Sequence, residues 1–341
     1  MKDFRRLAVV LAILLVAASG AVSESDVVEI VDQTGRVVRV EQPIERIASV
    51  YGPGTYYVYA LGVQARLVAG WYVGVKSFEK ATEAMIRFEP RLEELLLFGD
   101  PNVEEFVARS TQLVLLDGSR HGAFAEQMAD LGVPAIQYIV ETPEALRDAV
   151  RLTGRALGSE ASARAETFVA DFDRIFETTA EDLAGLSNED RVRVLFLGTA
   201  PLRVASGQMY QTRLIEAAGG LSVTADLFGY WNDVNLEQVL LWNPDVILIP
   251  PYGDVQPVDL LEDPDWQAIQ AVRDGRVHRM PRLIAPIDTP VPESVLGVVW
   301  MADVLYPDLV SLDLASEVEH FYTRYYEFVL SDDDLALLTT R

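Results

Sequence analysis

Residues 102–116, NVEEFVARSTQLVLL, and residues 235–249, NLEQVLLWNPDVILI, follow one pattern. Each stretch opens with Asn-x-Glu, continues with apolar residues at helical spacing, and ends in a short apolar run. A short helix followed by a buried strand is therefore expected in both places. Because the pattern is written twice, the chain is expected to contain two similar lobes.

The first half of the chain alternates between strand and helix patterns. Residues 27–43 predict a β-hairpin around a Thr-Gly turn, and Gly62 and Gly132 are expected to end two helices. The expected buried strands are residues 46–50, 66–71, 112–118 and 134–139, and the expected helices are residues 55–62 and 123–132. This alternation predicts an α/β lobe with a mostly parallel sheet and helices on both faces.

A long helix is expected to follow the first lobe. From residue 142 to about residue 186 there is no strand pattern, and apolar residues recur at helical spacing after Ser159, which is a plausible N-cap. We expect one helix over about residues 159–184. A helix of this length between two α/β units is a natural rigid connector.

The strand and helix patterns then resume in a second lobe. Strands are expected at residues 192–198, 245–250 and 275–281, and helices at residues 212–220, 266–272, 292–307 and 314–329. The expected fold is α/β, with two Rossmann-like lobes of mostly parallel sheet joined by one long interdomain helix. The expected boundaries are residues 24–141, 142–190, 191–312 and 313–341, the last holding a C-terminal helix and tail.

The first 23 residues have the pattern of a secretory signal peptide. The basic stretch MKDFRR precedes the apolar run LAVVLAILLVAA at residues 7–18, and small residues follow. The apolar run is short for a transmembrane helix. The chain has no cysteine, so it cannot carry a lipoprotein's lipid on that side chain. We therefore expect a cleaved, exported protein that resides in a periplasm.

Composition excludes several classes of function. The formal net charge is −24, which argues against nucleic acid or an anionic membrane surface as a partner. There is no Gly-rich phosphate loop, nucleophile elbow, zincin helix or paired-cysteine motif. With only three histidines, a bare soft divalent cation is a poor candidate ligand, and the identity of any bound metal stays open. These absences and the export signal weigh against an enzyme, and we expect no catalytic residues and no resident cofactor.

The order of several motifs resembles one family of transport proteins. The motifs include DQTGRVVRVEQPIERIASV, GDPNVEEF, DPDWQAIQAVRDGRVHRMP, PVPESVLGVVWMADVLYPDL and FYTRYYEFVLSDDDL. Together they resemble the substrate-binding proteins of ABC importers for iron–siderophore, haem and cobalamin, in which two α/β lobes are bridged by a long helix. The last two motifs are most similar to the branch for iron chelates and haem, which also contains molybdate and tungstate binders. One departure is RSTQLVLL in the first half, where the family usually has Pro-Asp before the strand.

This resemblance implies how the protein meets its partners. Glu104 and Glu237, the glutamates of the two Asn-x-Glu motifs, match the residues with which each lobe docks onto the permease. The implied partners are an ABC permease with its ATPase and a small-molecule metal chelate or oxyanion, and the protein is expected to be a monomer. A carboxylate favoured by the helix dipole is the simpler alternative, and Glu105 is the local competitor in the first lobe.

Candidate ligand-binding residues follow from the rule that ligands meet the loops after the carboxyl ends of parallel strands. These candidates are Tyr51, Tyr56, Trp71, Tyr72, Arg120, His121, Tyr210, Trp231, Tyr252, Arg282 and Asp288. A cleft of Tyr, Trp and Arg suits a large planar or anionic chelate such as a ferric siderophore or haem. Molybdate or tungstate, held by Arg282 and the amides of the YGPGT stretch, is the alternative. A two-lobed α/β transferase is a third hypothesis.

Overall fold

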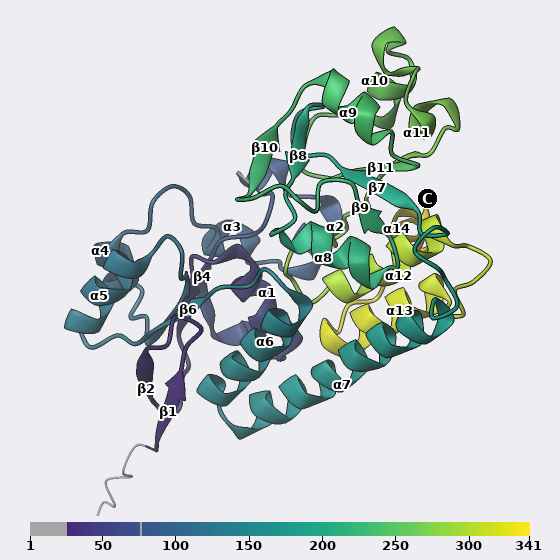
Figure 1. The fold of residues 1–341 in the computed structure, drawn as a ribbon. Coiled ribbons are helices and arrows are strands. Elements are labelled where there is room, and N and C mark those ends of the chain that lie inside the picture. Colours follow the sequence, from purple (N-terminus) through teal and green to yellow (C-terminus); the bar gives the residue numbers. More distant parts are fainter. Residues whose placement is uncertain (1–25, 76) are drawn as a thin grey trace, which may run out of the picture.

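The computed structural model describes residues 26–75 and 77–341, so the predicted signal peptide lies outside the described residues. The chain forms two α/β lobes, and helix α7 (Ser159–Asp182) runs along one side of both (Figure 1). The predicted fold class is confirmed. None of the helices in the described ranges is both long enough and apolar enough for a membrane span.

The N-terminal lobe is built on a four-stranded parallel sheet with the order β4-β3-β5-β6. Its strands are β3 (Ile47–Ser49), β4 (Leu67–Gly70), β5 (Leu113–Asp117) and β6 (Ala135–Tyr138). Its helices are α1 (Gly52–Ala60), α2 (Glu83–Phe88), α3 (Leu92–Leu95), α4 (Val103–Ala108) and α5 (Gly122–Asp130). The predicted hairpin forms from β1 (Val27–Val31) and β2 (Val37–Glu41), which pair antiparallel.

The C-terminal lobe repeats this topology. Its parallel sheet has the order β9-β7-β11-β12, so the first, second, third and fourth strands along the chain take the same places as in the first lobe. These strands are β7 (Arg193–Phe196), β9 (Leu221–Ser222), β11 (Val246–Ile249) and β12 (Val277–Arg279). The short strands β8 (Arg203–Ala205) and β10 (Trp231–Asp233) form an antiparallel pair beside the sheet. The helices are α8 (Tyr210–Ala217), α9 (Leu236–Trp242), α10 (Pro257–Leu261), α11 (Gln270–Arg273) and α12 (Ser294–Leu305).

The two Asn-x-Glu stretches occupy equivalent positions in this topology. Helix α4 leads into β5 and helix α9 leads into β11, which are the third strands of their sheets. Asn102 accepts a hydrogen bond from the Glu104 amide at 2.8 Å, and Asn235 accepts one from the Gln238 amide at 2.8 Å. Beyond each helix the matched residues Ser110 and Asn243 adopt left-handed backbone, with φ of 52° and 40°. The repeat therefore encodes the same cap, helix and turn twice.

Three local predictions are corrected by the structure. The long helix is capped by Gly158, not Ser159, which is its first residue. The predicted helix over residues 266–272 is broken, because the buried Ile269 is extended and the Gln270 amide bonds the Asn243 side chain to start α11. The segment after α13 (Leu314–Tyr325) is not a plain tail, because Ser331 and Asp334 form a capping box that starts α14 (Asp332–Thr339).

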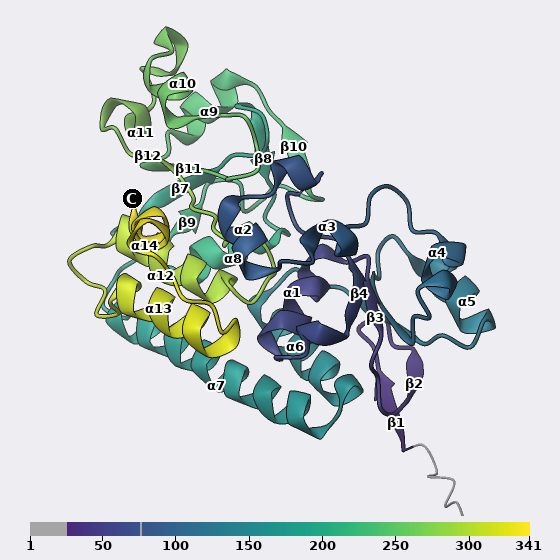
Figure 2. The same ribbon diagram turned by 180° about the vertical axis from the view of Figure 1, so that it is seen from behind.

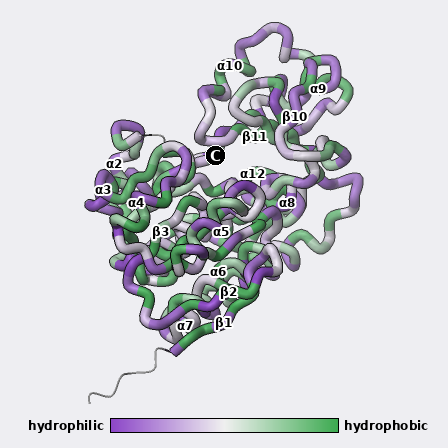
Figure 3. Tube along the Cα trace, turned by 90° about the vertical axis from the view of Figure 1, so that its left-hand side faces the viewer, coloured by the Kyte–Doolittle hydropathy of each residue, from purple (hydrophilic) through white to green (hydrophobic). Residues whose placement is uncertain are grey.

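The two lobes are held against each other along a continuous apolar core. One buried cluster includes residues of both sheets and of α6 (Pro143–Leu157), α7, α12 and α13. Hydrogen bonds also cross between the lobes, from the Tyr57 hydroxyl to the Pro290 carbonyl and from the Thr82 hydroxyl to the Leu283 carbonyl, both at 3.0 Å. Helices α12, α13 and α14 lie together on one side of the molecule (Figure 2), and Arg87 of α2 in the first lobe donates a hydrogen bond to Asp334 of α14. In side view α8 and α12 lie between the outer parts of the lobes (Figure 3).

Candidate functional site

A groove of about 570 Å³ opens at the carboxyl ends of β3, β4 and β5. The strand order places the crevice of this sheet between β3 and β5, because the chain leaves these two strands in opposite directions. The groove is lined by Val50, Tyr51, Gly52, Pro53, Trp71, Tyr72, Val73, Val75, Leu97, Phe98, Gly99, Asp117 and Arg120. It is therefore mostly apolar and aromatic, with one carboxylate and one guanidinium at its edge.

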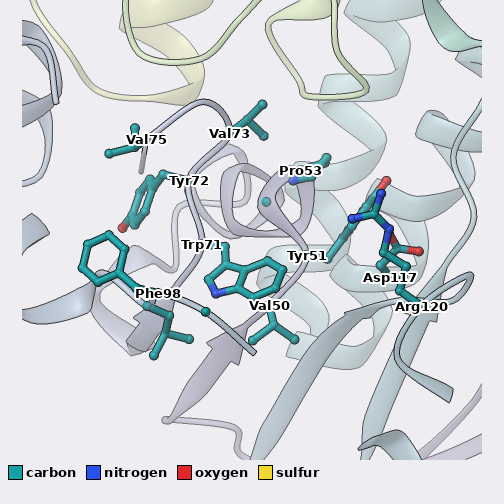
Figure 4. A pocket seen from close by; sticks show the side chains of 13 residues that line it. Val50, Tyr51, Pro53, Trp71, Tyr72, Val73, Val75, Phe98, Asp117 and Arg120 are labelled. Carbon is teal, nitrogen blue, oxygen red and sulfur yellow. The ribbon is translucent and has the colours of Figure 1, made fainter. Parts of the chain in front are cut away.

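Four of the predicted ligand-binding residues line this groove: Tyr51, Trp71, Tyr72 and Arg120. In Figure 4 the Trp71 indole lies between Tyr72 and Phe98 on one side and Tyr51, Asp117 and Arg120 on the other. The Tyr72 hydroxyl shares a 2.7 Å hydrogen bond with Tyr59, which fixes its ring. The structure thus brings residues from three separate loops to one wall.

The aromatic residues of the groove are held by neighbouring rings. Tyr51 stacks on Tyr138 with ring centroids 5.6 Å apart and an interplanar angle of 14°. Trp71 meets His121 edge to face at 5.6 Å, so His121 supports the groove from behind Trp71. Burial lowers the pKa of His121, which favours its neutral form near neutral pH. Rings held in this way are preorganised for contact with a flat ligand.

A smaller recess of about 180 Å³ lies beside the groove and is lined by residues of both lobes. Tyr230 of the second lobe faces Arg120, Asp117 and Glu141 of the first. Asp117 accepts hydrogen bonds from the amide and hydroxyl of Ser119 at 2.8 and 2.6 Å. Burial raises the pKa of the Glu141 carboxyl. The recess thus brings the Arg120 guanidinium and the carboxyl groups of Asp117 and Glu141 in the first lobe close to the Tyr230 phenol of the second lobe.

The second lobe contributes a polar cluster after β11. The Tyr252 hydroxyl donates to Asp288 Oδ2 at 2.7 Å, and the Gln211 side-chain amide donates to the same oxygen at 3.3 Å. Asp288 is fully buried, and burial raises the pKa of its carboxyl to about 6. Among the described residues its other oxygen, Oδ1, has no hydrogen-bond partner.

Arg282 connects this cluster to the first lobe. Its guanidinium donates to the Gly74 carbonyl at 3.3 Å and contacts the Met85 sulfur at 3.3 Å. Gly74 is in the loop that follows Trp71 and Tyr72, so Arg282 meets the outer side of a groove-lining loop. No carboxylate of the described residues lies within ion-pair distance of this arginine.

The remaining predicted residues do not join the groove. Tyr56 and Tyr210 are 0% and 1% exposed, and the Tyr210 hydroxyl is paired with Ser294 at 2.7 Å. Trp231 is half-buried on β10, where its ring packs against Gly198. In this structure the two tyrosines are core residues, because α1 and α8 turn these side chains toward the continuous core.

Sequence reasoning missed Phe98, Pro53 and Glu141. Phe98 is 54% exposed and lines the groove. It follows the apolar run Leu95–Leu97, where Leu96 forms an isolated bridge to Gly70 at the edge of the sheet. In the sequence, the position of Phe98 directly before Gly99 and Asp100 is the feature that could have indicated an exposed aromatic residue in a loop. In the described ranges no group of three or more His, Cys, Asp or Glu side chains is arranged to hold a metal ion.

The two predicted docking glutamates are exposed and lie in matched positions on α4 and α9. Neither Glu104 nor Glu237 forms an ion pair with another described residue. Glu105, in contrast, pairs with Arg109 at 2.9 Å within α4. Of the two neighbours, Glu104 is therefore the carboxylate that is available to a partner.

Comparison with known proteins places this architecture in a family. A family model described as periplasmic binding protein matches residues 47–282. The chain belongs to this periplasmic binding protein family and is a solute-binding protein of the ABC-transporter type. This family membership supports a periplasmic location and a transport role rather than catalysis.

Individual relatives differ in what their names say they bind. The molybdate-binding protein MolA of Haemophilus influenzae is 28% identical over 275 residues, covering 74% of this chain and 78% of the relative. A vitamin B12-binding protein of Yersinia pestis is 28% identical over 211 residues, covering 61% and 70%. The crystal structure of a periplasmic solute binding protein from Veillonella parvula superimposes with a TM-score of 0.79 at 26% identity, covering 92% and 97%.

Proposed function

We propose that this protein captures an iron chelate, a ferric siderophore or haem, between its lobes and delivers it to the permease of an ABC importer. The observation that carries this proposal is the aromatic groove of about 570 Å³ at the crevice of the first sheet. Its volume falls within the range of pockets for small organic ligands, roughly 300–1,000 Å³. Trp71, Tyr51 and Phe98 offer flat apolar surface, and Arg120 offers charge for an anionic chelate.

Molybdate or tungstate is the second candidate, and two observations favour it. The relative MolA is named for molybdate. Helix α1 also begins at the groove with Gly52 and Pro53 and has no side-chain cap, so its amino end is free to meet an anion. Against this, a tetrahedral oxyanion would fill only a small part of the groove and would leave its aromatic walls without a partner.

Export and docking complete the proposal. Residues 1–23 act as a signal peptide, and the mature protein, without a cysteine for lipid attachment, stays free in the periplasm as a monomer. Glu104 and Glu237 contact basic residues at the two-fold related sites of the permease. Two unpaired carboxylates on separate lobes would fix the orientation of docking and increase its rate.

The test is a set of binding titrations in which the tryptophan fluorescence of the protein is monitored, and Trp71 is expected to report ligand binding. Purified protein is titrated with haemin, a ferric tris-catecholate, a ferric hydroxamate, cyanocobalamin and sodium molybdate. We expect saturable one-to-one binding of one iron chelate, with a fluorescence change that is lost in Trp71→Phe. Trp242→Phe, a half-buried tryptophan outside the groove, is the matched control. Saturable binding of molybdate alone would contradict the iron-chelate proposal.

A further inference from the structure

Helices α4 and α9 have matched backbones but unequal exposed faces. In α9, Leu240 and Leu241 follow Glu237 by three and four residues and therefore lie beside it on the helix surface. Leu240 is 37% exposed and Leu241 is 79% exposed. In α4 the matched residues beside Glu104 are Val107, 52% exposed, and Ala108.

The inner faces of the two helices do not differ in this way. Phe106 of α4 and Val239 of α9 occupy the matched inward position, and both are 0% exposed. Leu240 still packs partly on its lobe, but Leu241, which is 79% exposed, contributes little to holding the helix there. Leu241 and the exposed part of Leu240 are adjacent, so together with Glu237 they form a small apolar patch beside a carboxylate that has no ion-pair partner among the described residues.

We propose that Leu240 and Leu241 are an apolar anchor for the permease, and that the second lobe supplies most of the docking affinity. This inference rests on the proposed function, and the partner that would cover the patch is the permease surface that receives Glu237. Because Glu237 is acidic and the two leucines are apolar, that surface should carry a basic residue next to an apolar pocket.

The two patches then have different roles in docking. The first-lobe patch, Glu104 with Val107 and Ala108, offers a carboxylate and smaller apolar side chains than the two leucines of α9. It contributes orientation and electrostatic attraction, whose effect falls with salt. The second-lobe patch buries leucine side chains, whose contribution is insensitive to salt and slows dissociation. In such a contact the second lobe supplies most of the affinity, and the first lobe sets the orientation.

The experiment measures binding of ligand-free protein to the cognate permease–ATPase complex in lipid nanodiscs. We expect Leu241→Ala to weaken binding roughly tenfold and Val107→Ala less than threefold, in line with the apolar area each side chain exposes. Ala108→Leu, which copies the second-lobe face onto the first, should strengthen binding. Leu309→Ala, a 47% exposed leucine between α12 and α13, is the matched control and should have no effect.

The outcomes separate the inference from the function on which it rests. Wild-type affinity in Leu241→Ala, or a larger loss in Val107→Ala, would overturn the anchor while leaving the transport role intact. If the wild-type protein does not bind the permease at any salt concentration, both the anchor and the proposed function fail. Circular dichroism of each variant confirms folding, and unchanged ligand titrations show that the groove is unaffected.

Discussion

The Tyr252 hydroxyl donates a 2.7 Å hydrogen bond to the fully buried carboxylate of Asp288, which leaves Asp288 Oδ1 without a partner among the described residues. Glu293, five residues later, is also fully buried and accepts a hydrogen bond from Tyr326, the residue that follows α13. Burial raises the pKa of Asp288 to about 6 and that of Glu293 to about 7. Both buried carboxyl groups therefore bind their protons more tightly than ordinary carboxyl groups do.

These two groups predict that stability falls as pH rises. Between the ordinary carboxyl pKa and the raised values, the folded state binds more protons than the unfolded state, so the free energy of unfolding decreases with pH. The decrease should begin near pH 4, continue through pH 7 and level off by about pH 8. Melting temperatures at pH 5 and pH 8 measure this effect, and Asp288→Asn or Glu293→Gln should reduce the difference. Glu126→Gln, at an exposed carboxylate, is the control. A higher melting temperature at pH 8, or an unchanged difference in both variants, would contradict this assignment.

Gly74 should be less tolerant of alanine than other glycines of similar backbone. A Cβ at Gly74 would lie 2.7 Å from an Arg282 nitrogen, and its φ of +74° adds strain. Gly132 has a φ of +75° and no atom within 4 Å of such a Cβ, so alanine at this position measures the cost of the backbone conformation without a steric clash. In chemical denaturation we expect Gly132→Ala to cost about 1 kcal/mol and Gly74→Ala a few tenths of a kcal/mol more, because the flexible end of Arg282 can move away but then weakens its hydrogen bond to the Gly74 carbonyl. The extra cost should disappear in an Arg282→Ala background, and its persistence there would show that Arg282 is not the cause.

The C-terminal helix α14 should stabilise the first lobe through Arg87. Both oxygens of Asp334 accept hydrogen bonds from this arginine, at 2.8 and 2.7 Å, and the Asp334 side chain is only 9% exposed. A double-mutant cycle with Arg87→Ala and Asp334→Asn should give a coupling energy of about 1–2 kcal/mol. The same cycle on the exposed pair Arg213–Glu216 should give less than about 0.5 kcal/mol. Equal coupling in the two pairs would refute a bridging role for α14.

Removing both docking carboxylates should separate binding from transport. Glu104→Ala with Glu237→Ala is expected to leave ligand affinity and melting temperature unchanged, because neither side chain contacts the groove or an ion-pair partner in the described residues. Uptake of the labelled ligand by cells should fall at least tenfold. Glu105→Ala, which removes a carboxylate that is already paired with Arg109, should retain uptake. Loss of ligand binding in the double variant would refute the docking role.

The fold was predictable because its signals are local and repeated. Alternating apolar strands and helices, glycines such as Gly62 and Gly132 at helix ends, and the twin Asn-x-Glu stretches each report on a few neighbouring residues. The predicted helix boundaries were wrong where a contact between residues far apart in the sequence overrides the local helix preference. The helix expected across Ile269 is broken because the Gln270 amide bonds Asn243, which is 27 residues earlier.

The site was only partly predictable, because strand-end position does not fix the direction of a side chain. Tyr51 and Tyr56 are separated by five positions around the start of α1, yet Tyr51 lines the groove and Tyr56 is in the core. Phe98 enters the groove from a segment outside the parallel strands, joined to the sheet through Leu96. Such convergence depends on how loops pack on one another, which a single sequence does not specify.

Native mass spectrometry of the mature protein, purified from the periplasm of its own host, tests the central claim most directly. The account predicts a one-to-one complex whose added mass matches an organic iron chelate or haem and is lost in a variant with Trp71→Ala and Arg120→Ala. An added mass that matches a tetrahedral metal oxyanion would contradict the account. It would instead assign the amino end of α1 to molybdate or tungstate.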